Sequence, residues 1–187
     1  MPDKPSYLGI LNALCVGEAG AARYLTAWIE KTEDPEVREV LTKVCHREAE
    51  HAAAFAKRIN ELGFSVREKH DKGMDKACEI ASSDLSDLEK MEKLHVGEEL
   101  NVFDTIFTDH TIDVQTGALL GRYIAEEHDT NRMTRACRAK LAARQNGSSG
   151  TSQSDELAHL SKQVDELCQA VDELRQIVSG KTKAARS

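Results

Sequence analysis

The chain has 187 residues, a formal net charge of −7 and only 4% aromatic residues. This length fits one ordinary domain with an appendage, and the predominance of Ala, Leu, Glu, Lys and Arg predicts an all-α fold. The acidic balance, with no basic face, argues against a nucleic-acid partner, and the short, charge-interrupted apolar runs argue against a membrane span.

The cysteines point to a reducing compartment. The chain has 5 cysteines, scattered along its length, and no Cys-x-x-Cys pair. An odd number without framework spacing is typical of reduced thiols, and the N-terminus lacks the apolar core of a signal peptide. We therefore expect a cytoplasmic protein.

Two long amphipathic helices are predicted first, over residues 7–31 and 34–62. The apolar face of the first has Glu18 at its centre. Asp34 is a good N-cap for the second helix, Pro35 suits its first position and Gly63 closes it. Because the connection is short, the two helices should form an antiparallel hairpin.

The second helix carries a Glu-x-x-His pair on its apolar face. Glu48 and His51 lie three residues apart and so point to the same side, one turn above the other. Unpaired polar groups buried in an apolar stripe cost roughly several kcal/mol, so something must compensate them. Such a pair facing a bundle interior is half of a common metal-binding arrangement, although many surface helices also contain it.

The remaining residues up to 144 predict a crossing segment and a second hairpin. Residues 64–83 are less regular, with a short helix at 74–81, and are long enough to cross from one end of a bundle to the other. A third long helix is predicted over residues 86–108, with Glu98 central on its inner face. Asp113 caps a fourth helix, whose apolar stripe contains Glu127 and Thr130.

The second hairpin repeats the first at a shift of 79 or 80 residues. Both caps and both apolar stripes keep their register, and each helix has one central glutamate. The matched pairs are Gly17 with Gly97, Glu18 with Glu98, Asp34 with Asp113, and Glu48 with Glu127. The alternative is that these carboxylates are paired with Lys or Arg, but no basic residue lies at the centre of a stripe. Because four unpaired carboxylates in one core would repel each other, two divalent cations are the better explanation.

The order Glu, Glu-x-x-His, Glu, Glu across four helices resembles the ferritin-like superfamily of di-iron carboxylate proteins, rubrerythrin-type members especially. The resemblance covers residues 7–144. It implies an antiparallel four-helix bundle with a long crossover between its second and third helices, and two irons per chain, with Mn or Zn as alternatives. By position, the implied ligands are Glu18, Glu48, His51, Glu98 and Glu127.

The fourth helix departs from the family pattern. The family has a second histidine three residues after Glu127, where this chain has Thr130, and His128 points off the stripe. His95, one turn before Glu98, could substitute as a ligand or could lie beside one. These departures weaken one of the two metal positions.

Two further side chains flank the predicted centre on the fourth helix. Glu126 could swing in, because it and its neighbour Glu127 straddle the stripe. Tyr123, one turn from Glu127, is a candidate catalytic residue that could hydrogen-bond a ligand or donate an electron. An ordinary core tyrosine is the alternative.

The C-terminal residues, 145–187, predict a segment through which the chain forms a dimer. Residues 145–154 form a Gly/Ser-rich flexible linker, which ends the domain of residues 1–144. Residues 155–179 have Val and Leu alternating three and four apart, the seam of a parallel homodimeric coiled coil. The alternative is an amphipathic helix that docks on its own bundle. Residues 180–187 are predicted to be a disordered basic tail.

Two classes of function follow. The first is a non-haem di-iron oxidoreductase, a peroxidase or ferroxidase, that reacts with peroxide or dioxygen. Because no rubredoxin-like Cys-x-x-Cys module is present, its electrons would come from another protein or from Fe(II) itself. The second class is a ferritin-like interaction module with a vestigial or single-metal site, oligomerised by the coiled coil.

Overall fold

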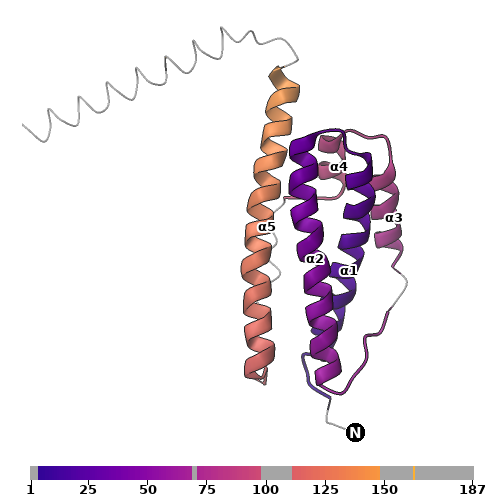
Figure 1. Cartoon of the computed structure of the whole chain (residues 1–187), viewed down its shortest axis with the longest axis vertical. Helices are drawn as coiled ribbons and strands as arrows, with labels where there is room; N and C mark the ends of the chain where they lie inside the picture. The colour runs from indigo at the N-terminus through magenta and orange to yellow at the C-terminus, as the bar shows by residue number, and fades with distance from the viewer. Residues whose placement is uncertain (1–3, 69–70, 98–110, 148–161, 163–187) are drawn as a thin grey trace, which may run out of the picture. The chain divides into compact units, whose positions relative to one another are not determined.

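The structure, a computed structural model, describes residues 4–68, 71–97, 111–147 and 162. Every regular element in these ranges is an α-helix, so the predicted all-α class is confirmed there. The chain divides into a compact unit of residues 1–141 and a second unit of residues 142–187. All contacts described below lie within the first unit, whose helices are labelled in Figure 1.

The first two helices form the predicted antiparallel hairpin (Figure 1). They are α1 (Leu8–Lys31) and α2 (Pro35–Glu61). The Asp34 carboxylate accepts hydrogen bonds of 2.8 and 3.2 Å from two backbone N–H groups in the first turn of α2. Gly63 follows the end of α2 with a φ of 83°, a left-handed conformation that glycine adopts without strain. Both boundaries of α2 agree with the prediction.

Two short helices follow the hairpin, and both are fastened to α1. On α3 (Lys72–Ser82), Met74 packs so closely on Gly20 that a Cβ atom there would lie 2.3 Å from the Met74 Cε. At the start of α4 (Asp87–Lys93), the Asp87 carboxylate accepts one hydrogen bond from Trp28 Nε1 and one from a threonine hydroxyl at the end of α1, each 2.6 Å long. The two short helices are therefore held against α1, α3 by packing and α4 by hydrogen bonds.

The predicted third long helix, residues 86–108, differs from the structure over its described part, residues 86–97. The α4 helix ends at Lys93, and His95 takes a left-handed conformation with a φ of 55°. The Val96 N–H donates to the Met91 carbonyl at 2.9 Å. This hydrogen bond, together with a left-handed residue before its donor, is the Schellman motif that ends many helices. Gly97 is also left-handed, with a φ of 80°. The prediction of an unbroken helix through these residues is therefore wrong.

The last described helix is α5 (Val114–Gly147). The Asp113 carboxylate caps it, as predicted, by accepting from two backbone N–H groups of its first turn, at 3.0 Å each. The same carboxylate accepts from the Tyr7 hydroxyl at 2.6 Å and from Arg58 at 2.9 Å, which ties the cap to the N-terminus and to α2.

The predicted C-terminal elements lie mostly outside the described residues. The predicted linker begins at residue 145, but α5 continues through 147, so its first residues are helical. The coiled coil predicted over 155–179 and the tail predicted over 180–187 fall outside the described ranges, apart from Lys162, and stay predictions.

Buried apolar side chains form two clusters, one toward each end of the hairpin. The first joins the start of α1 to the end of α2 and the start of α5: Tyr7, Leu11, Cys15, Phe55, Ile59, Leu120 and Tyr123. The second joins the end of α1 to the start of α2, α3, α4 and the later part of α5: Leu25, Trp28, Val37, Leu41, Val44, Ala81, Met91 and Cys137. Between the residues of these two clusters, α1 and α2 bury the charged or polar side chains of Glu18, Glu48 and His51.

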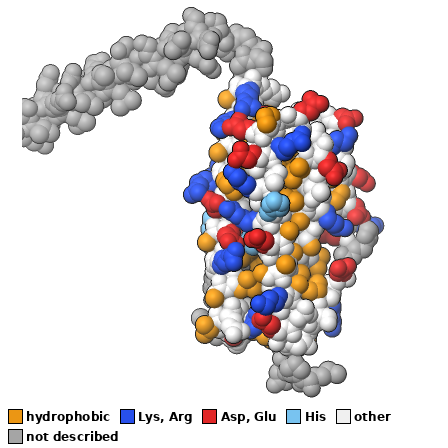
Figure 2. Space-filling model, in the orientation of Figure 1, with side chains coloured by type: hydrophobic (Ala, Val, Ile, Leu, Met, Phe, Trp, Pro, Cys, Tyr) orange, Lys and Arg blue, Asp and Glu red, His pale blue; other side chains and the backbone are white. Residues whose placement is uncertain are grey.

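The visible face of the molecule mixes charges of both signs. Figure 2 shows acidic and basic side chains interspersed there, with apolar side chains between them and no continuous basic patch. None of the helices that the structure describes carries an apolar stretch sufficient to span a bilayer.

Candidate metal centre

Four polar side chains from three helices meet between the two apolar clusters. Glu18 comes from α1, Glu48 and His51 from α2, and Glu127 from α5; one potential ligand atom of each lies within 4.8 Å of the others. Glu18, Glu48 and His51 are only 8%, 6% and 5% exposed. The structure thus brings together four of the residues that the sequence predicts as ligands.

The His51 ring faces this cluster with its Nδ1 atom. Nδ1 lies 3.3 Å from the Glu127 Oε1 and 4.0 Å from one carboxylate oxygen each of Glu18 and Glu48. Both the His51 Nδ1 and the Glu127 Oε1 are buried without a hydrogen-bond partner. Since buried polar atoms are nearly always satisfied, these two facing atoms fit a bound cation.

The other ring nitrogen of His51 is held by Glu126. Its Nε2 lies 2.8 Å from the Glu126 Oε2, while the Glu126 Oε1 accepts from the Arg122 Nε at 2.9 Å. Burial opposes ionisation of Glu126, but the hydrogen bonds from His51 and Arg122 outweigh it and lower the carboxyl pKa. A carboxylate that accepts from Nε2–H leaves Nδ1 with its lone pair, the arrangement that suits a metal ligand.

Tyr123 links the cluster to the first apolar cluster. Its hydroxyl donates to the Glu18 Oε1 at 2.7 Å, and its ring packs edge-on against His51 and Phe55, with centroids 4.9 and 5.1 Å away. Burial and the Glu18 carboxylate raise the pKa of the Tyr123 hydroxyl, so it stays a hydrogen-bond donor. Hydrogen bonding to a candidate ligand is what the sequence suggests for this residue; its predicted electron-transfer role stays a prediction.

A second tyrosine, Tyr24, was not found by sequence reasoning. Burial, together with the carboxylates of Glu48, Glu18 and Glu127, raises the pKa of its hydroxyl. Tyr24 therefore lies within electrostatic reach of the cluster. It is the residue before Leu25, beside the apolar stripe of α1 and not on it, so the helical period gives no signal for it.

The cluster carries more negative charge than its neighbours balance. Within the described ranges, no Lys or Arg forms an ion pair with Glu18, Glu48 or Glu127. Burial and the neighbouring Glu18 carboxylate raise the pKa of Glu48 far above its usual range. For His51, burial disfavours the protonated ring, but the contacts with Glu127 and Glu126 outweigh it and raise the pKa. Protons or a cation must therefore neutralise the cluster.

The other predicted site residues lie elsewhere. Glu98 falls outside the described residues, and its role as a ligand stays a prediction. His95 is exposed, beyond the end of α4, and is not part of the cluster. His128 is exposed on α5. Thr130 is buried, and its hydroxyl accepts from the Arg47 Nη1 at 3.0 Å.

The donor set fits a divalent transition-metal ion. Three carboxylates and one imidazole nitrogen suit Fe(II), Mn(II) or Zn(II), whereas a set without thiolates does not select the softer ions. Comparisons with protein-family models, curated proteins and solved structures find no match to this chain. The ferritin-like resemblance therefore stays a prediction that rests on residue types and spacing.

Proposed function

We propose that this chain is a non-haem iron oxidoreductase of the ferritin-like, rubrerythrin type, which reduces peroxide or dioxygen at a di-iron centre. The ligands would be Glu18, Glu48, His51 and Glu127, with Glu98 as a fifth. The observation that carries the proposal is the buried cluster in which the His51 Nδ1 and the Glu127 Oε1 face each other without hydrogen-bond partners.

The surroundings support a redox role for the cluster. When bound, an iron pair would supply two electrons, one from each Fe(II), to hydrogen peroxide, which with two protons becomes two molecules of water. Oxygen-rich ligands carrying negative charge favour the ferric state. The Tyr123 hydroxyl holds Glu18 at 2.7 Å, and Glu126 holds the His51 ring, so two of the ligands are fixed in orientation before any metal arrives.

The test is metal analysis followed by anaerobic loading with Fe(II) and addition of hydrogen peroxide or air. Wild type should bind two irons per chain and develop near-ultraviolet ferric absorbance faster than buffer oxidises free Fe(II). Glu48→Ala and Glu127→Ala should fail in both respects. The exposed Glu39 lies on the same helix as Glu48, and Glu39→Ala should behave as wild type. Iron oxidation no faster than in buffer would contradict the redox function.

A second candidate is an interaction module with a single-metal site, oligomerised by the C-terminal segment. The observation that favours it is the Arg47 guanidinium, which bonds both the Thr130 hydroxyl and the Glu126 carbonyl, at 3.0 and 3.1 Å. A fixed positive charge thus lies where the family places its second histidine ligand. One metal ion per chain without peroxide chemistry would select this candidate over the di-iron centre.

Assembly through the coiled coil belongs to both candidates. We propose a parallel homodimer through residues 155–179, in a reducing compartment such as the cytoplasm. Truncation after Arg144 should leave a folded helical domain that is monomeric by light scattering, whereas the full chain should be dimeric. A full-length chain that is monomeric at micromolar concentration would refute the dimer.

A further inference from the structure

A groove between α2 and α5 leads from the surface to the candidate metal centre. Its volume is about 400 Å³, and its apolar walls include Ala53, Phe55 and Leu119. The buried side chains His51 and Tyr123 also line it, and both face the carboxylate cluster from their other side. The groove is therefore lined by two residues that are also in contact with the cluster.

Two carboxylates line this groove, those of Glu50 and Glu126, and with Glu127 in the cluster they form a series of decreasing exposure. The Glu50 side chain at the rim is 72% exposed, that of Glu126 is 27% exposed, and that of Glu127 in the cluster is 11% exposed. Glu126 is in contact with His51, whose Nδ1 faces the unpartnered Glu127 oxygen. A cation entering here would thus have a carboxylate ligand at each depth, ending at buried atoms that lack a partner.

The charged side chains at the rim of the groove favour a cation over an anion as its occupant. Arg122 is the cation that lines the groove, and its guanidinium already bonds Glu126 at 2.9 Å and lies 4.0 Å from Glu50. An incoming anion would have to displace Glu126 and approach Glu50, whereas a cation meets two carboxylates against one guanidinium. The Arg122 side chain is 66% exposed, so it can turn toward solvent without leaving a buried charge.

We propose that this groove is the route by which a divalent cation reaches the metal centre. Glu50 and Glu126 guide it inward, and Arg122 opposes its entry. The inference rests on the proposed metal binding, but it concerns the rate of loading and not the affinity of the loaded centre. It therefore makes predictions that a purely structural role for these residues would not produce.

The experiment follows the loading of Co²⁺ into the metal-free full-length protein by stopped-flow absorbance of its visible bands. Ala53 is exposed on the groove wall, so Ala53→Trp should fill the groove and slow loading at least about tenfold while equilibrium affinity stays within twofold of wild type. The matched control is Ala49→Trp, one turn away on the same helix, which is exposed but does not line the groove and should load at the wild-type rate.

Two charge variants test the polarity of the route. Removing one rim charge changes the Coulomb energy of an approaching divalent ion, and the expected change in rate is about a few-fold at low salt. Glu50→Gln should therefore slow loading a few-fold and Arg122→Gln should accelerate it, and both effects should shrink at high salt. Glu39→Gln, an exposed glutamate on α2 outside the groove, is the charge-matched control.

The outcomes separate the route from the function. If wild type binds no Co²⁺ at equilibrium, the proposed metal centre fails, and the route fails with it. If wild type binds Co²⁺ but Ala53→Trp, Glu50→Gln and Arg122→Gln all load like their controls, only the route is overturned. Opposite changes in rate for the two charge variants support it, because a general loss of stability would not accelerate either one.

Discussion

The α1 helix runs for 24 residues without interruption, whereas α4, its counterpart in the sequence repeat, ends after 7. The Val-Gly-Glu triplet of α1, at residues 16–18, recurs after α4 at residues 96–98, in the same register of the repeat. In α1 the triplet continues the helix and places Glu18 in the carboxylate–histidine cluster. After α4 the same triplet follows a left-handed His95, and its glycine is left-handed too. The same three-residue sequence therefore occurs within a long helix in one half of the repeat and beyond the end of a short helix in the other.

The cluster of Glu18, Glu48, His51 and Glu127 shows the same asymmetry between the two regions. The hairpin of α1 and α2 supplies three of the four described residues of the cluster, and α5 supplies only Glu127. The contribution of α5 lies more in support, because Tyr123 and Glu126 orient ligands that belong to the hairpin. Within the described residues, then, one half provides most of the ligands and the other fixes their geometry.

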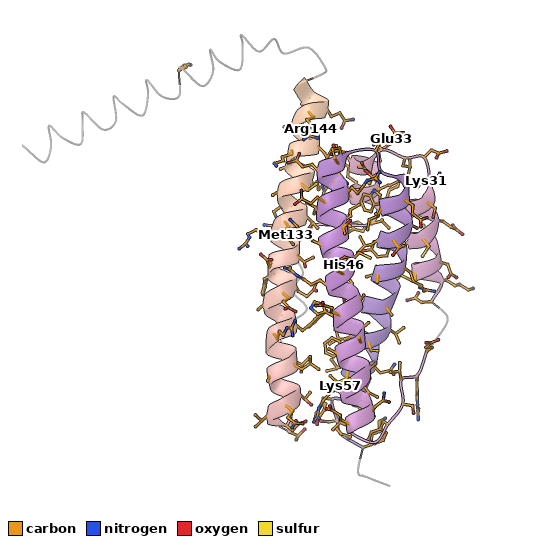
Figure 3. All side chains as sticks on the ribbon, viewed as in Figure 1. Lys31, Glu33, His46, Lys57, Met133 and Arg144 are labelled. Atoms are coloured by element: carbon orange, nitrogen blue, oxygen red, sulfur yellow. The ribbon has the colours of Figure 1, made fainter. Side chains whose placement is uncertain are left out.

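The largest expected effect comes from removing a ligand of the first hairpin. His51→Ala should lower metal affinity by at least about 100-fold, because it removes the only nitrogen donor among the four cluster residues. The control is His46→Ala on the same helix; His46 is exposed, on the side of α2 that faces the viewer in Figure 3. His128→Ala on α5 should also leave the affinity unchanged. Isothermal titration with Co²⁺ measures all three, and equal losses would show that the ligands are wrongly assigned.

The next effect compares the two N-caps that match in the repeat. Asp34→Ala should cost about 1 kcal/mol, the usual value for a helix cap. Asp113→Ala should cost about 2 kcal/mol, since it also removes partners of Tyr7 and Arg58 in a half-exposed setting where solvent weakens the ion pair. Urea unfolding measures both costs, and equal values would mean that the additional contacts contribute nothing.

The pH dependence of this cap has a defined sign. Burial opposes ionisation of Asp113, but hydrogen bonds from Tyr7, Thr116 and Arg58 outweigh it and hold its pKa well below the ordinary 3.8. A depressed pKa in the folded state stabilises the protein above the unfolded-state value, and that contribution is lost as the pH falls below it. The stability difference between wild type and Asp113→Ala should therefore shrink as the pH is lowered from about 4.

Substitutions at two matched glycines should change the stability with opposite signs. Gly17 lies within α1, where an added Cβ atom meets nothing within 4 Å, so Gly17→Ala should stabilise the protein by about 0.5–1 kcal/mol. At Gly97, with its φ of 80°, the Cβ atom would lie 3.1 Å from the Arg135 backbone nitrogen on α5. Gly97→Ala should therefore destabilise by about 1–2 kcal/mol. Thermal unfolding followed by circular dichroism measures both, and stabilisation by both variants would indicate a helix at Gly97.

These glycines also show what the sequence could predict. Caps such as Asp34 and Asp113 are local, because a side chain bonds backbone groups two or three residues away, and both were predicted correctly. The end of α4, in contrast, is not determined by neighbouring residues alone. Nothing in the triplet around Gly97 distinguishes it from its helical match, and its close approach to the α5 backbone exists only in the folded chain.

The cluster was predictable to a similar degree. Glu48 and His51 share a helix face, and that periodicity alone identifies them. The repeat adds Glu127, which does join them. The bond between Glu126 and the outer nitrogen of His51 depends on how α5 is rotated against α2, and the proximity of Tyr24 depends on the reach of a long side chain. The hydrophobic period of a single helix predicts neither the rotation of α5 nor the reach of the Tyr24 side chain.

The bond between Trp28 and Asp87 has a spectroscopic consequence. Trp28 is the single tryptophan of the chain, it is fully buried, and its indole N–H donates to the first residue of α4 at 2.6 Å. Intrinsic fluorescence therefore reports on one place, the junction of the first hairpin with α4. Circular dichroism instead averages over all helices. An unfolding transition seen by dichroism but not by tryptophan emission would mark a part of the chain that melts independently of this junction.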